Sequence, residues 1–362
     1  MDPALARITD RIRAAAAAGT PLRIRGGGSK DFLGERPEGE LLATTELSGI
    51  VSYEPSELVV TARAGTPLAQ LEQALAERGQ CLPFEPPHFG PAATVGGMVA
   101  AGLSGPARAS VGAVRDYVLG LQLVNGRGEE LVFGGQVMKN VAGYDVSRLM
   151  AGAMGTLGLI TEVSLKVLPL SPAEATLRFE LPQAEALRRL NAWGGQPLPL
   201  NASCWVEDAG VPTLFLRLRG AVAAVESACR ALGGERMDNA QAAADWAACR
   251  EQCLPWFAEC GGRELWRLSV PQTAPVLDLP EAPLVEWHGG QRWVRVAPQD
   301  GARVREAAVR AGGHATLFRT SRADATGRST PLAPALAAIH ERLKQQFDPA
   351  GILNRGRLFP QS

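Results

Sequence analysis

Three glycine-rich stretches in the first half of the chain constrain its fold more than any other feature. They are RGGGSK at 25–30, TVGGM at 94–98 and GAMGTLG at 152–158. A backbone that lacks Cβ atoms can approach a pyrophosphate closely and offer it several N–H groups. We therefore interpret the three stretches as parts of one nucleotide site.

The arrangement does not match the common phosphate-binding motifs. The first stretch lacks the spacing of a P-loop, and Lys30 is followed by Asp31 rather than by a Ser or Thr that would hold Mg²⁺. None of the three stretches reads G-x-G-x-x-G between a strand and a helix. A site divided among three distant segments indicates a different class of cofactor domain.

Length and charge limit the class of protein. A chain of 362 residues is long enough for two domains with sizeable cores. Its 37 basic and 37 acidic residues balance, which argues against nucleic acid as a partner and favours small molecules or proteins. No apolar run approaches the roughly 20 residues that span a bilayer, and the run Ala14–Ala18 is too short for a signal-peptide core. We therefore expect a cytoplasmic protein.

Cysteine and histidine spacing does not predict a metal site. Cys249, Cys253 and Cys260 follow the pattern C-x₃-C-x₆-C, which differs from zinc and iron–sulfur motifs. The first two are spaced to share one side of a helix. The histidines are scattered over positions 88, 288, 314 and 340. We expect buried or free thiols and no tightly bound metal.

The first half is expected to alternate strands and helices. Asp2 and Pro3 predict a helix that ends at Gly19, and Thr66 with Pro67 predicts a second helix that continues to about Arg78. A short helix is expected at about 145–150. The expected strands are 22–25, 58–63, 117–124, 129–133 and 159–168.

The second glycine-rich stretch reads as the start of another helix. Thr94 is a suitable N-cap residue. A helix that begins there would leave the N–H groups of Val95, Gly96 and Gly97 free to face an anion.

The second half predicts an α+β domain that follows a boundary at Ser171–Pro172. The expected strands are 213–218, 265–270 and 293–296, and the expected helices are 221–232 and 302–310. A last helix at about 335–346 leads into a turn and a short apolar tail.

Five motifs in order resemble the FAD-binding domain of the vanillyl-alcohol oxidase and para-cresol methylhydroxylase family, over roughly residues 7–169. They are RGGGS at 25–29, PSEL at 55–58, AGT at 64–66, TVGG at 94–97 and GTLGLITEVSLKV at 155–167. The ending FDPAGILNRGRL at 347–358 is similar to that of the 2-hydroxy-acid dehydrogenase branch.

Within this family the chain resembles the smaller flavin-domain subunits of bacterial glycolate oxidases. The strings that carry this likeness are at 84–108, 114–120, 133–152 and 314–319. The resemblance implies an α+β fold with a two-lobed FAD-binding domain at 1–170, a cap domain at 171–330 and a segment at 331–362 that returns to the first domain. It also implies FAD, oxidation of glycolate to glyoxylate, and a complex with a larger FAD-binding subunit and an iron–sulfur subunit.

The resemblance assigns the FAD contacts to the glycine-rich stretches and their neighbours. The residues assigned in this way are Arg25, Gly26, Gly27, Gly28, Ser29, Thr94, Gly96, Gly97, Gly102, Gly155, Thr156, Gly158, Ile160 and Asn354. In covalent members of the family a histidine follows the first glycine run, whereas Ser29 stands there in this chain. We therefore expect noncovalent FAD.

Catalytic residues are not identified by the sequence. The candidates are His314 and Arg319 as hydroxyl and carboxylate contacts, followed by Lys139 and Tyr144; the alternative for His314 and Arg319 is an ordinary cap-domain strand. His88 is expected to shape a loop beside the flavin.

Two classes of function stay open. The chain is either a flavoprotein subunit that takes part in glycolate oxidation, or a structural or electron-relay partner whose FAD is idle. A stand-alone flavin oxidoreductase of the same fold is a weaker alternative. Attachment to the inner face of the cell membrane would come through partner subunits. Five tryptophans are candidates for a partner interface or for the cap-domain core: Trp246, Trp256, Trp266, Trp287 and Trp293.

Overall fold

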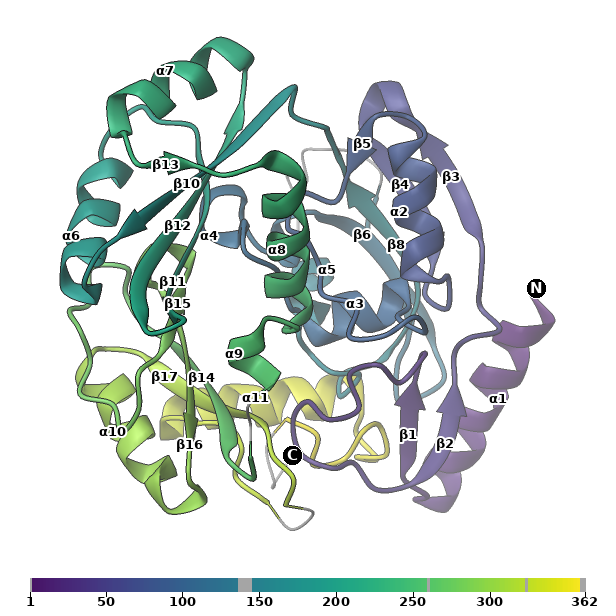
Figure 1. Cartoon of the computed structure of the whole chain (residues 1–362). Coiled ribbons are helices and arrows are strands. Elements are labelled where there is room, and N and C mark those ends of the chain that lie inside the picture. The colour runs from purple at the N-terminus through teal and green to yellow at the C-terminus, as the bar shows by residue number, and fades with distance from the viewer. Residues whose placement is uncertain (1, 136–144, 259–260, 323–324, 359–362) are drawn as a thin grey trace. The chain divides into compact units, whose positions relative to one another are not determined.

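The computed structural model describes residues 2–135, 145–258, 261–322 and 325–358 (Figure 1). The chain divides into two compact units. Unit 1 holds residues 1–103, 113–169 and 331–362, and unit 2 holds residues 104–112 and 170–330. The stretch 104–112, which the sequence assigned to the first domain, groups with unit 2 because Trp287 donates its indole N–H to Gly105 O at 3.0 Å.

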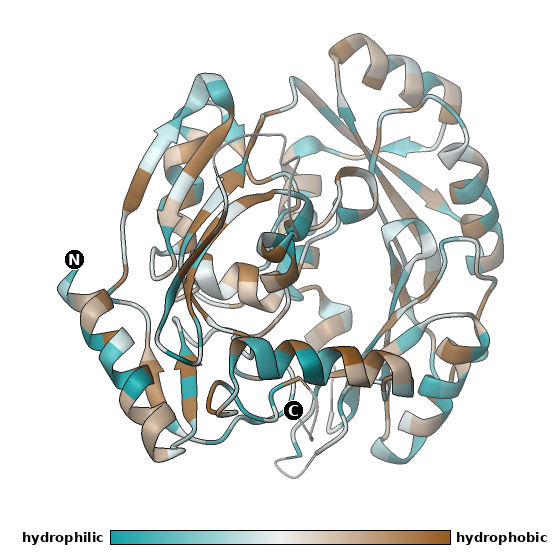
Figure 2. Ribbon diagram, turned by 180° about the vertical axis from the view of Figure 1, so that it is seen from behind, coloured by the Kyte–Doolittle hydropathy of each residue, from teal (hydrophilic) through white to brown (hydrophobic). Residues whose placement is uncertain are grey.

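Unit 1 begins with a helix packed on two parallel strands. α1 (Pro3–Ala18) starts at Asp2, whose carboxylate accepts the N–H of Ala4 at 2.8 Å, and ends at Gly19 with φ at 67°. Hydrophobic and hydrophilic residues alternate around this helix (Figure 2), and Ile12 lies on its buried side. The strands are β1 (Leu22–Arg25) and β2 (Glu40–Ala43). The predicted bounds of α1 and β1 are confirmed.

A five-stranded antiparallel sheet forms the rest of the unit 1 framework. In sheet order its strands are β3 (Ile50–Glu54), β4 (Val59–Arg63), β8 (Leu159–Lys166), β6 (Val118–Val124) and β7 (Glu130–Gly134). The predicted hairpin between β6 and β7 is confirmed: Asn125 Oδ1 accepts the N–H groups of Arg127 and Glu129 at 2.9 and 3.0 Å. A two-stranded ladder joins β5 (Gln80–Cys81) to β9 (Leu168–Pro169).

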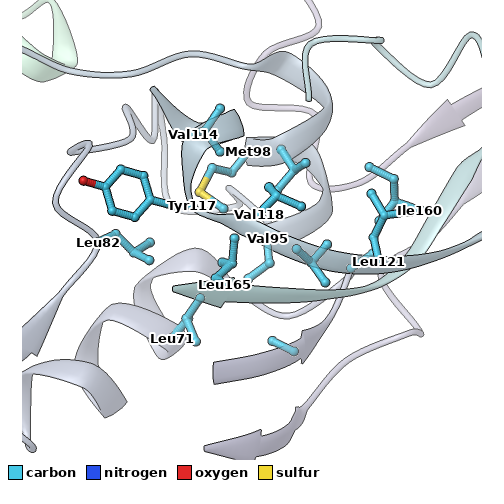
Figure 3. Close-up of a cluster of buried hydrophobic side chains, with 14 of the residues drawn as sticks. Leu71, Leu82, Val95, Met98, Val114, Tyr117, Val118, Leu121, Ile160 and Leu165 are labelled. Carbon is cyan, nitrogen blue, oxygen red and sulfur yellow. The ribbon is translucent and has the colours of Figure 1, made fainter. Parts of the chain in front are cut away.

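The core of unit 1 lies between this sheet and its helices, α2 (Leu68–Ala76), α3 (Val95–Ala101) and α5 (Val146–Met150). Figure 3 shows Leu71 of α2 and Met98 of α3 in one cluster with Val118 and Leu165 of the strands. A fully buried Leu or Val side chain contributes about 1.5–3 kcal/mol. These contacts fix the strand and helix ends that carry the glycine-rich stretches.

The start of α2 differs from the prediction. The helix begins at Leu68, and the side chain of Thr66 does not cap it. The Thr66 hydroxyl instead donates to Gly49 O and accepts the Gly49 N–H, both at 3.0 Å. Thr66 therefore holds the backbone of Gly49, directly before β3, in place.

The C-terminal part of unit 1 returns to β1. α11 (Pro334–Phe347) is followed by residues 348–358 without regular structure. Leu22 N–H donates to Ile352 O at 2.7 Å, and Asn354 N–H donates to Leu22 O at 2.9 Å. Residues 352–354 thus run beside β1, the strand that leads into the first glycine-rich stretch.

Unit 2 is built on an eight-stranded antiparallel sheet. In sheet order its strands are β13 (Glu235–Arg236), β10 (Ala173–Glu180), β12 (Val211–Gly220), β11 (Leu200–Asp208), β15 (Leu284–Glu286), β16 (Gln291–Val296), β14 (Glu264–Ser269) and β17 (His314–Arg319). The helices α6 (Gln183–Gly194), α7 (Val222–Leu232) and α10 (Gly301–Arg310) bury apolar side chains against one face.

The opposite face of this sheet carries α8 (Asn239–Glu251) and α9 (Pro255–Ala258). Trp246 of α8 donates to the Thr176 hydroxyl at 3.0 Å, and the Arg295 guanidinium lies 4.5 Å from the ring centroid of Trp256 in α9. We name this side the α8 face. Cross-strand pairing places Thr176, Arg217, Arg267 and Arg295 on it.

Candidate cofactor site in unit 1

The three glycine-rich stretches come together in unit 1, and their glycines allow the backbones to touch. A Cβ on Gly27 would lie 1.4 Å from Ala92 O, and one on Gly26 would lie 2.5 Å from the Thr94 hydroxyl. The first stretch therefore packs directly on the second. A Cβ on Gly102 would lie 2.7 Å from the Cα of Gly152, so α3 ends against the third stretch.

The first stretch offers a row of unpaired donors. Within the described part of the chain, the N–H groups of Gly26, Gly27, Gly28 and Ser29 donate to no protein group. Gly28 has φ at 76°, a left-handed conformation that turns successive N–H groups toward one side. A loop of this kind binds the oxygens of a phosphate or pyrophosphate.

The second stretch contributes in a different way from the one predicted. Thr94 does cap α3, accepting the Gly97 N–H at 3.3 Å. The other donors are occupied: Val95 N–H donates to Thr66 O at 2.9 Å, and Gly96 N–H donates to Ala64 O at 2.7 Å. The prediction of three free donors at this helix start is wrong, because the turn after β4 supplies acceptors for Val95 and Gly96 and the Thr94 hydroxyl accepts the Gly97 N–H.

The third stretch is tied to α3 through backbone hydrogen bonds. Gly152 N–H donates to Val99 O at 3.0 Å, and Met154 N–H donates to Ala100 O at 2.9 Å. The Thr156 hydroxyl donates to Ala153 O at 2.7 Å, which closes the turn before β8. Gly158 packs against Leu123, and Ile160 is buried in β8.

Side chains around the first loop hold it in shape. Arg25 pairs with Asp31 at 2.7 Å, and its guanidinium lies over Gly28. Lys30 donates to His88 O at 3.0 Å, and His88 is 2.8 Å from the carboxylate of Glu72. His88 thus joins the loop to α2, in keeping with a structural role.

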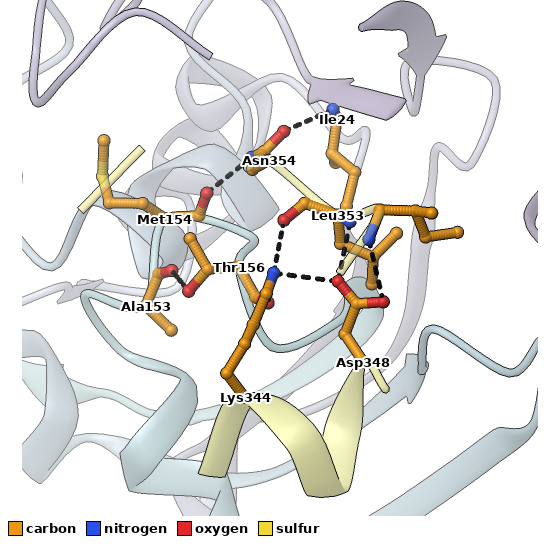
Figure 4. A network of polar contacts seen from close by, with 9 residues as sticks. Ile24, Ala153, Met154, Thr156, Lys344, Asp348, Leu353 and Asn354 are labelled. Carbon is orange, nitrogen blue, oxygen red and sulfur yellow. Dashed lines mark hydrogen bonds and ion pairs between the residues drawn. The ribbon is translucent and has the colours of Figure 1, made fainter. Parts of the chain in front are cut away.

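The C-terminal segment binds the third stretch through a buried ion pair (Figure 4). Lys344 Nζ donates to Thr156 O at 2.9 Å and to Leu353 O at 2.8 Å, and it lies 2.8 Å from the Asp348 carboxylate. Asp348 also accepts the N–H groups of Ile352 and Leu353 at 3.2 and 2.7 Å. Burial lowers the pKa of Lys344, and the hydrogen bond with Asp348 opposes this shift.

Asn354 and Arg357 extend this contact to the first stretch. Asn354 Oδ1 accepts the Ile24 N–H at 2.7 Å, and its amide nitrogen donates to Met154 O at 2.6 Å. Arg357 donates to the carbonyl oxygens of Lys30, Asp31 and Glu35 at 3.1–3.2 Å. We name Lys344, Asp348, Asn354 and Arg357 the C-terminal clamp.

Sequence reasoning identified only Asn354 of this clamp. Lys344 is one of four lysines among the chain's 37 basic residues, and Asp348 follows it at the i+4 position of a helix. This rarity of lysine, combined with the spacing, is a signal that could have identified the pair but was not used. No local pattern indicated that Arg357 would reach a loop more than 320 residues earlier in the chain.

Comparisons with known proteins agree with this geometry. A family model described as an FAD binding domain matches residues 5–134, which include the first two glycine-rich stretches. Glycolate oxidase subunit GlcE of Escherichia coli (strain K12) is 46% identical over 354 residues, or 98% of this chain and 97% of that protein. The chain belongs to the GlcE family.

Other relatives cover less of the chain or are more distant. Glycolate oxidase subunit GlcD of Bacillus subtilis (strain 168) is 31% identical over 159 residues, or 43% of this chain and 34% of that protein. A solved structure of alkyldihydroxyacetonephosphate synthase superposes with a TM-score of 0.67 at 13% identity, over 96% of this chain and 74% of that one. This likeness shows that the GlcE-family chain has the same α+β fold.

The first glycine-rich stretch of this GlcE-family chain fits FAD. A pyrophosphate needs donors that are not already bonded, and residues 26–29 present four such N–H groups in sequence. Some of the other assigned residues hold the second and third stretches in place. Thr94 and Gly96 hold the second stretch, whereas Gly155 and Asn354 bring the third stretch against Ile24.

The candidate catalytic pair is not brought together. His314 and Arg319 lie at the two ends of β17 in unit 2, about 16 Å apart at 3.2–3.4 Å per residue. Arg319 also donates to the side chain of Gln252 at 3.2 Å. One molecule the size of glycolate cannot contact both. Lys139 and Tyr144 lie outside the described residues.

The tryptophans and cysteines of unit 2 are mainly part of its interior. Four of the five named tryptophans are buried, and Trp256 is half-buried, so the proposed Trp interface is reduced to this one residue. Cys249 is buried and Cys253 is exposed, and both are free thiols. They do not share a helix side as predicted, because α8 ends at Glu251 and Gln252 turns into the left-handed region. Cys260 lies outside the described residues.

Proposed function

We propose that this member of the GlcE family is the FAD-binding subunit of a complex that oxidises glycolate to glyoxylate. The row of unpaired N–H groups at residues 26–29, held in place by the C-terminal clamp, is the observation that carries the proposal. Gly26, Gly27, Gly28 and Ser29 would bind the pyrophosphate of FAD. FAD bound there would supply an acceptor for the hydride that leaves the α-carbon of glycolate.

The clamp supports the flavin site from the protein side. Lys344 and Asn354 fix the backbone of residues 154–156, and Arg357 fixes that of residues 30–35. Loops held in one conformation lose less conformational entropy when they bind a ligand. We therefore expect the clamp to raise the affinity for FAD without touching it.

Noncovalent attachment is part of the proposal. Ser29 stands where covalent members of the resembled family have a histidine. A serine hydroxyl does not offer the nucleophilic ring nitrogen through which histidine forms such a bond. Acid precipitation of the purified chain should therefore release flavin into the supernatant.

We infer partners from the relatives that match. GlcE of Escherichia coli is named as a subunit of glycolate oxidase, and GlcD of Bacillus subtilis is named as another subunit of such an enzyme. We propose that the chain assembles with a larger FAD-binding subunit and with an iron–sulfur subunit that accepts electrons. None of the helices in the described ranges combines the length and apolar character needed to cross a membrane. We propose a cytoplasmic location, with any membrane attachment made through the partners.

A second candidate function is that of an electron-relay or structural subunit. The separation of His314 from Arg319 along β17 favours it, because these two residues do not form a substrate site by themselves.

Anaerobic addition of glycolate distinguishes the two functions. The visible spectrum of the chain would be recorded alone and in complex with its partners, before and after glycolate is added. Bleaching of the flavin bands in the chain alone supports a catalytic subunit. Bands that respond only in the complex support a relay or structural role, and a chain that purifies without flavin contradicts both.

A further inference from the structure

Arg267 lies on the α8 face of unit 2, on the strand next to the edge strand β17. It lies on β14, between β16 and β17, with Trp293 opposite it on one side and Thr316 on the other. Its guanidinium carbon is 5.6 Å from the ring centroid of Phe318, and the residue is half-buried. Residues paired across antiparallel strands point to the same face, so Trp293 and Thr316 border the guanidinium.

Arg267 differs from the other buried arginines of unit 2. Arg292 donates to the carbonyl oxygens of Ala274 and Pro275 at 2.7 and 2.6 Å, and Arg217 donates to Asn201 Oδ1 at 2.7 Å. For Arg267, the described part of the chain provides no hydrogen-bond acceptor and no carboxylate within ion-pair distance. Its five donors are therefore left to solvent, and a half-buried guanidinium of this kind is available to an anionic ligand.

A second cation acts on Arg267. The Arg108 guanidinium, on α4 (Arg108–Val111), stacks 4.4 Å from the Trp287 ring centroid. Burial and the positive charge of Arg108 lower the pKa of Arg267 to about 10. Partial burial and the charge of Arg267 in turn lower the pKa of His314, which is diagonal to Arg267 across the β14–β17 pair. The two guanidinium groups are thus close enough for the charge of one to act on the other.

The buried carboxylate on the same face, Glu286, forms no ion pair with Arg267 in the described part of the chain. Glu286 accepts the indole N–H of Trp293 at 2.5 Å, the side-chain amide of Gln291 at 3.0 Å and the thiol of Cys249 at 3.3 Å. These three hydrogen bonds come from neutral donors.

We propose that Arg267 and Arg108 form a binding site for the carboxylate of a small 2-hydroxy acid on the α8 face. The planar fork of Arg267 suits two parallel hydrogen bonds to a carboxylate. The Thr316 hydroxyl and the neutral imidazole of His314 stand beside it as partners for the ligand's hydroxyl group. The choice of a 2-hydroxy acid rests on the proposed function, whereas the choice of an anion rests on the unpaired, half-buried guanidinium of Arg267.

Calorimetric titration of glycolate into the full FAD-loaded chain tests the site. In Arg267→Met the dissociation constant for glycolate should rise about 10- to 100-fold, the loss expected for a charge-assisted pair of hydrogen bonds. Arg267→Lys keeps the charge but loses the planar fork of donors. Its dissociation constant for glycolate should lie between those of the unchanged chain and of Arg267→Met. Arg310→Gln is the matched control, because Arg310 is an exposed arginine of α10 that pairs with Glu306, and it should bind glycolate like the unchanged chain.

Titrations with two other ligands define which chemical group the site recognises. Ethylene glycol, which replaces the carboxylate of glycolate with a neutral group, should not bind, and inorganic phosphate should compete only weakly. Phosphate that binds more tightly than glycolate would overturn the assignment to a carboxylate.

Unchanged glycolate affinity in a folded Arg267→Met variant would overturn the site itself. If that variant does not fold, Arg108→Gln tests the same site from outside the sheet. We expect its affinity for glycolate to fall several-fold, and an unchanged affinity would contradict the inference. The flavin content and glycolate bleaching of the unchanged chain report on the proposed function separately. Glycolate that binds but reduces the flavin neither in the chain alone nor in the complex would therefore contradict the proposed function, while the binding site would still be supported.

Discussion

The ammonium group of Lys344 donates to the carbonyl oxygen of Thr156 at 2.9 Å, across 188 positions of the sequence. Its exposed side-chain fraction is 12%, and that of its partner Asp348 is 0%. This contact joins the end of α11 to the third glycine-rich stretch. The cofactor loops of unit 1 are therefore held by the last part of the chain.

Lys344→Met tests the ion pair. The change leaves the Asp348 carboxylate buried without its cation, which should lower the free energy of unfolding by about 3–5 kcal/mol. We expect FAD to be lost at the same time, because Thr156 O loses its donor. Urea unfolding followed by circular dichroism, together with the flavin content after gel filtration, would measure both effects.

The double variant Lys344→Met/Asp348→Asn separates charge from packing. An asparagine at 348 is neutral and keeps an acceptor for one of the two N–H groups, those of Ile352 and Leu353, that Asp348 accepts. It should recover about half of the stability lost in the single variant. A double variant that is less stable than Lys344→Met would mean that the buried charge is not the cause.

Asn354→Asp tests the joint between the first and third stretches with almost no change in shape. The new carboxylate can still accept the Ile24 N–H, but it loses the hydrogen bond to Met154 O and faces that oxygen as a like charge. Fluorescence titration should show FAD affinity reduced about tenfold or more. Asn239→Asp, at the exposed start of α8, should leave the affinity unchanged.

Gly27→Ala tests the contact between the first and second stretches. The added Cβ would overlap Ala92 O at 1.4 Å, so the two loops must separate. We expect loss of FAD and a lower melting temperature. Gly194→Ala in α6 is the matched control: its Cβ meets open space, and it should be neutral or stabilising by up to about 1 kcal/mol.

The stability of unit 2 should depend on pH through His288. Burial lowers the pKa of this imidazole to about 4 from its ordinary 6.5. The ring is held by the hydroxyls of Ser203 and Ser110 at 3.1 and 3.0 Å. Below pH 6.5 His288 is protonated in the unfolded chain but not in the folded chain. The contribution of His288 to the free energy of unfolding is therefore fully present above pH 6.5 and is lost as the pH falls toward 4. The loss should reach about 3 kcal/mol.

His288→Asn measures that contribution. Asparagine tolerates the left-handed backbone of this position, where φ is 55°. Denaturant unfolding of the variant between pH 4 and 7.5 should show a shallower slope than the unchanged chain. Equal slopes would mean that other groups produce the acid sensitivity.

Much of unit 1 was predictable because its signals are local. Asp2, Pro3 and Gly19 define α1, and the turn at Asn125 defines the β6–β7 hairpin. In unit 2, β11 was not predicted from sequence. Residues 201–206 of this strand are all buried, and the alternation of polar and apolar residues that marks a one-sided strand stops after Cys204.

The site was predictable only in part for the same physical reason. Glycine runs predict loops with unusual backbone conformations, and Thr94 predicts the start of a helix. Whether an N–H group is free depends on its tertiary neighbours, and Ala64 and Thr66 occupy the donors of Gly96 and Val95. The reach of Arg357 to the first stretch is likewise a tertiary contact without a local pattern.

The most direct test of the central claim is the absorption spectrum of the two fractions obtained when the purified chain is precipitated with acid. If residues 26–29 hold FAD without a covalent bond, the supernatant will show flavin bands near one equivalent per chain, and the pellet will be colourless. Flavin retained in the pellet would contradict noncovalent binding, and no flavin in either fraction would contradict the cofactor site itself.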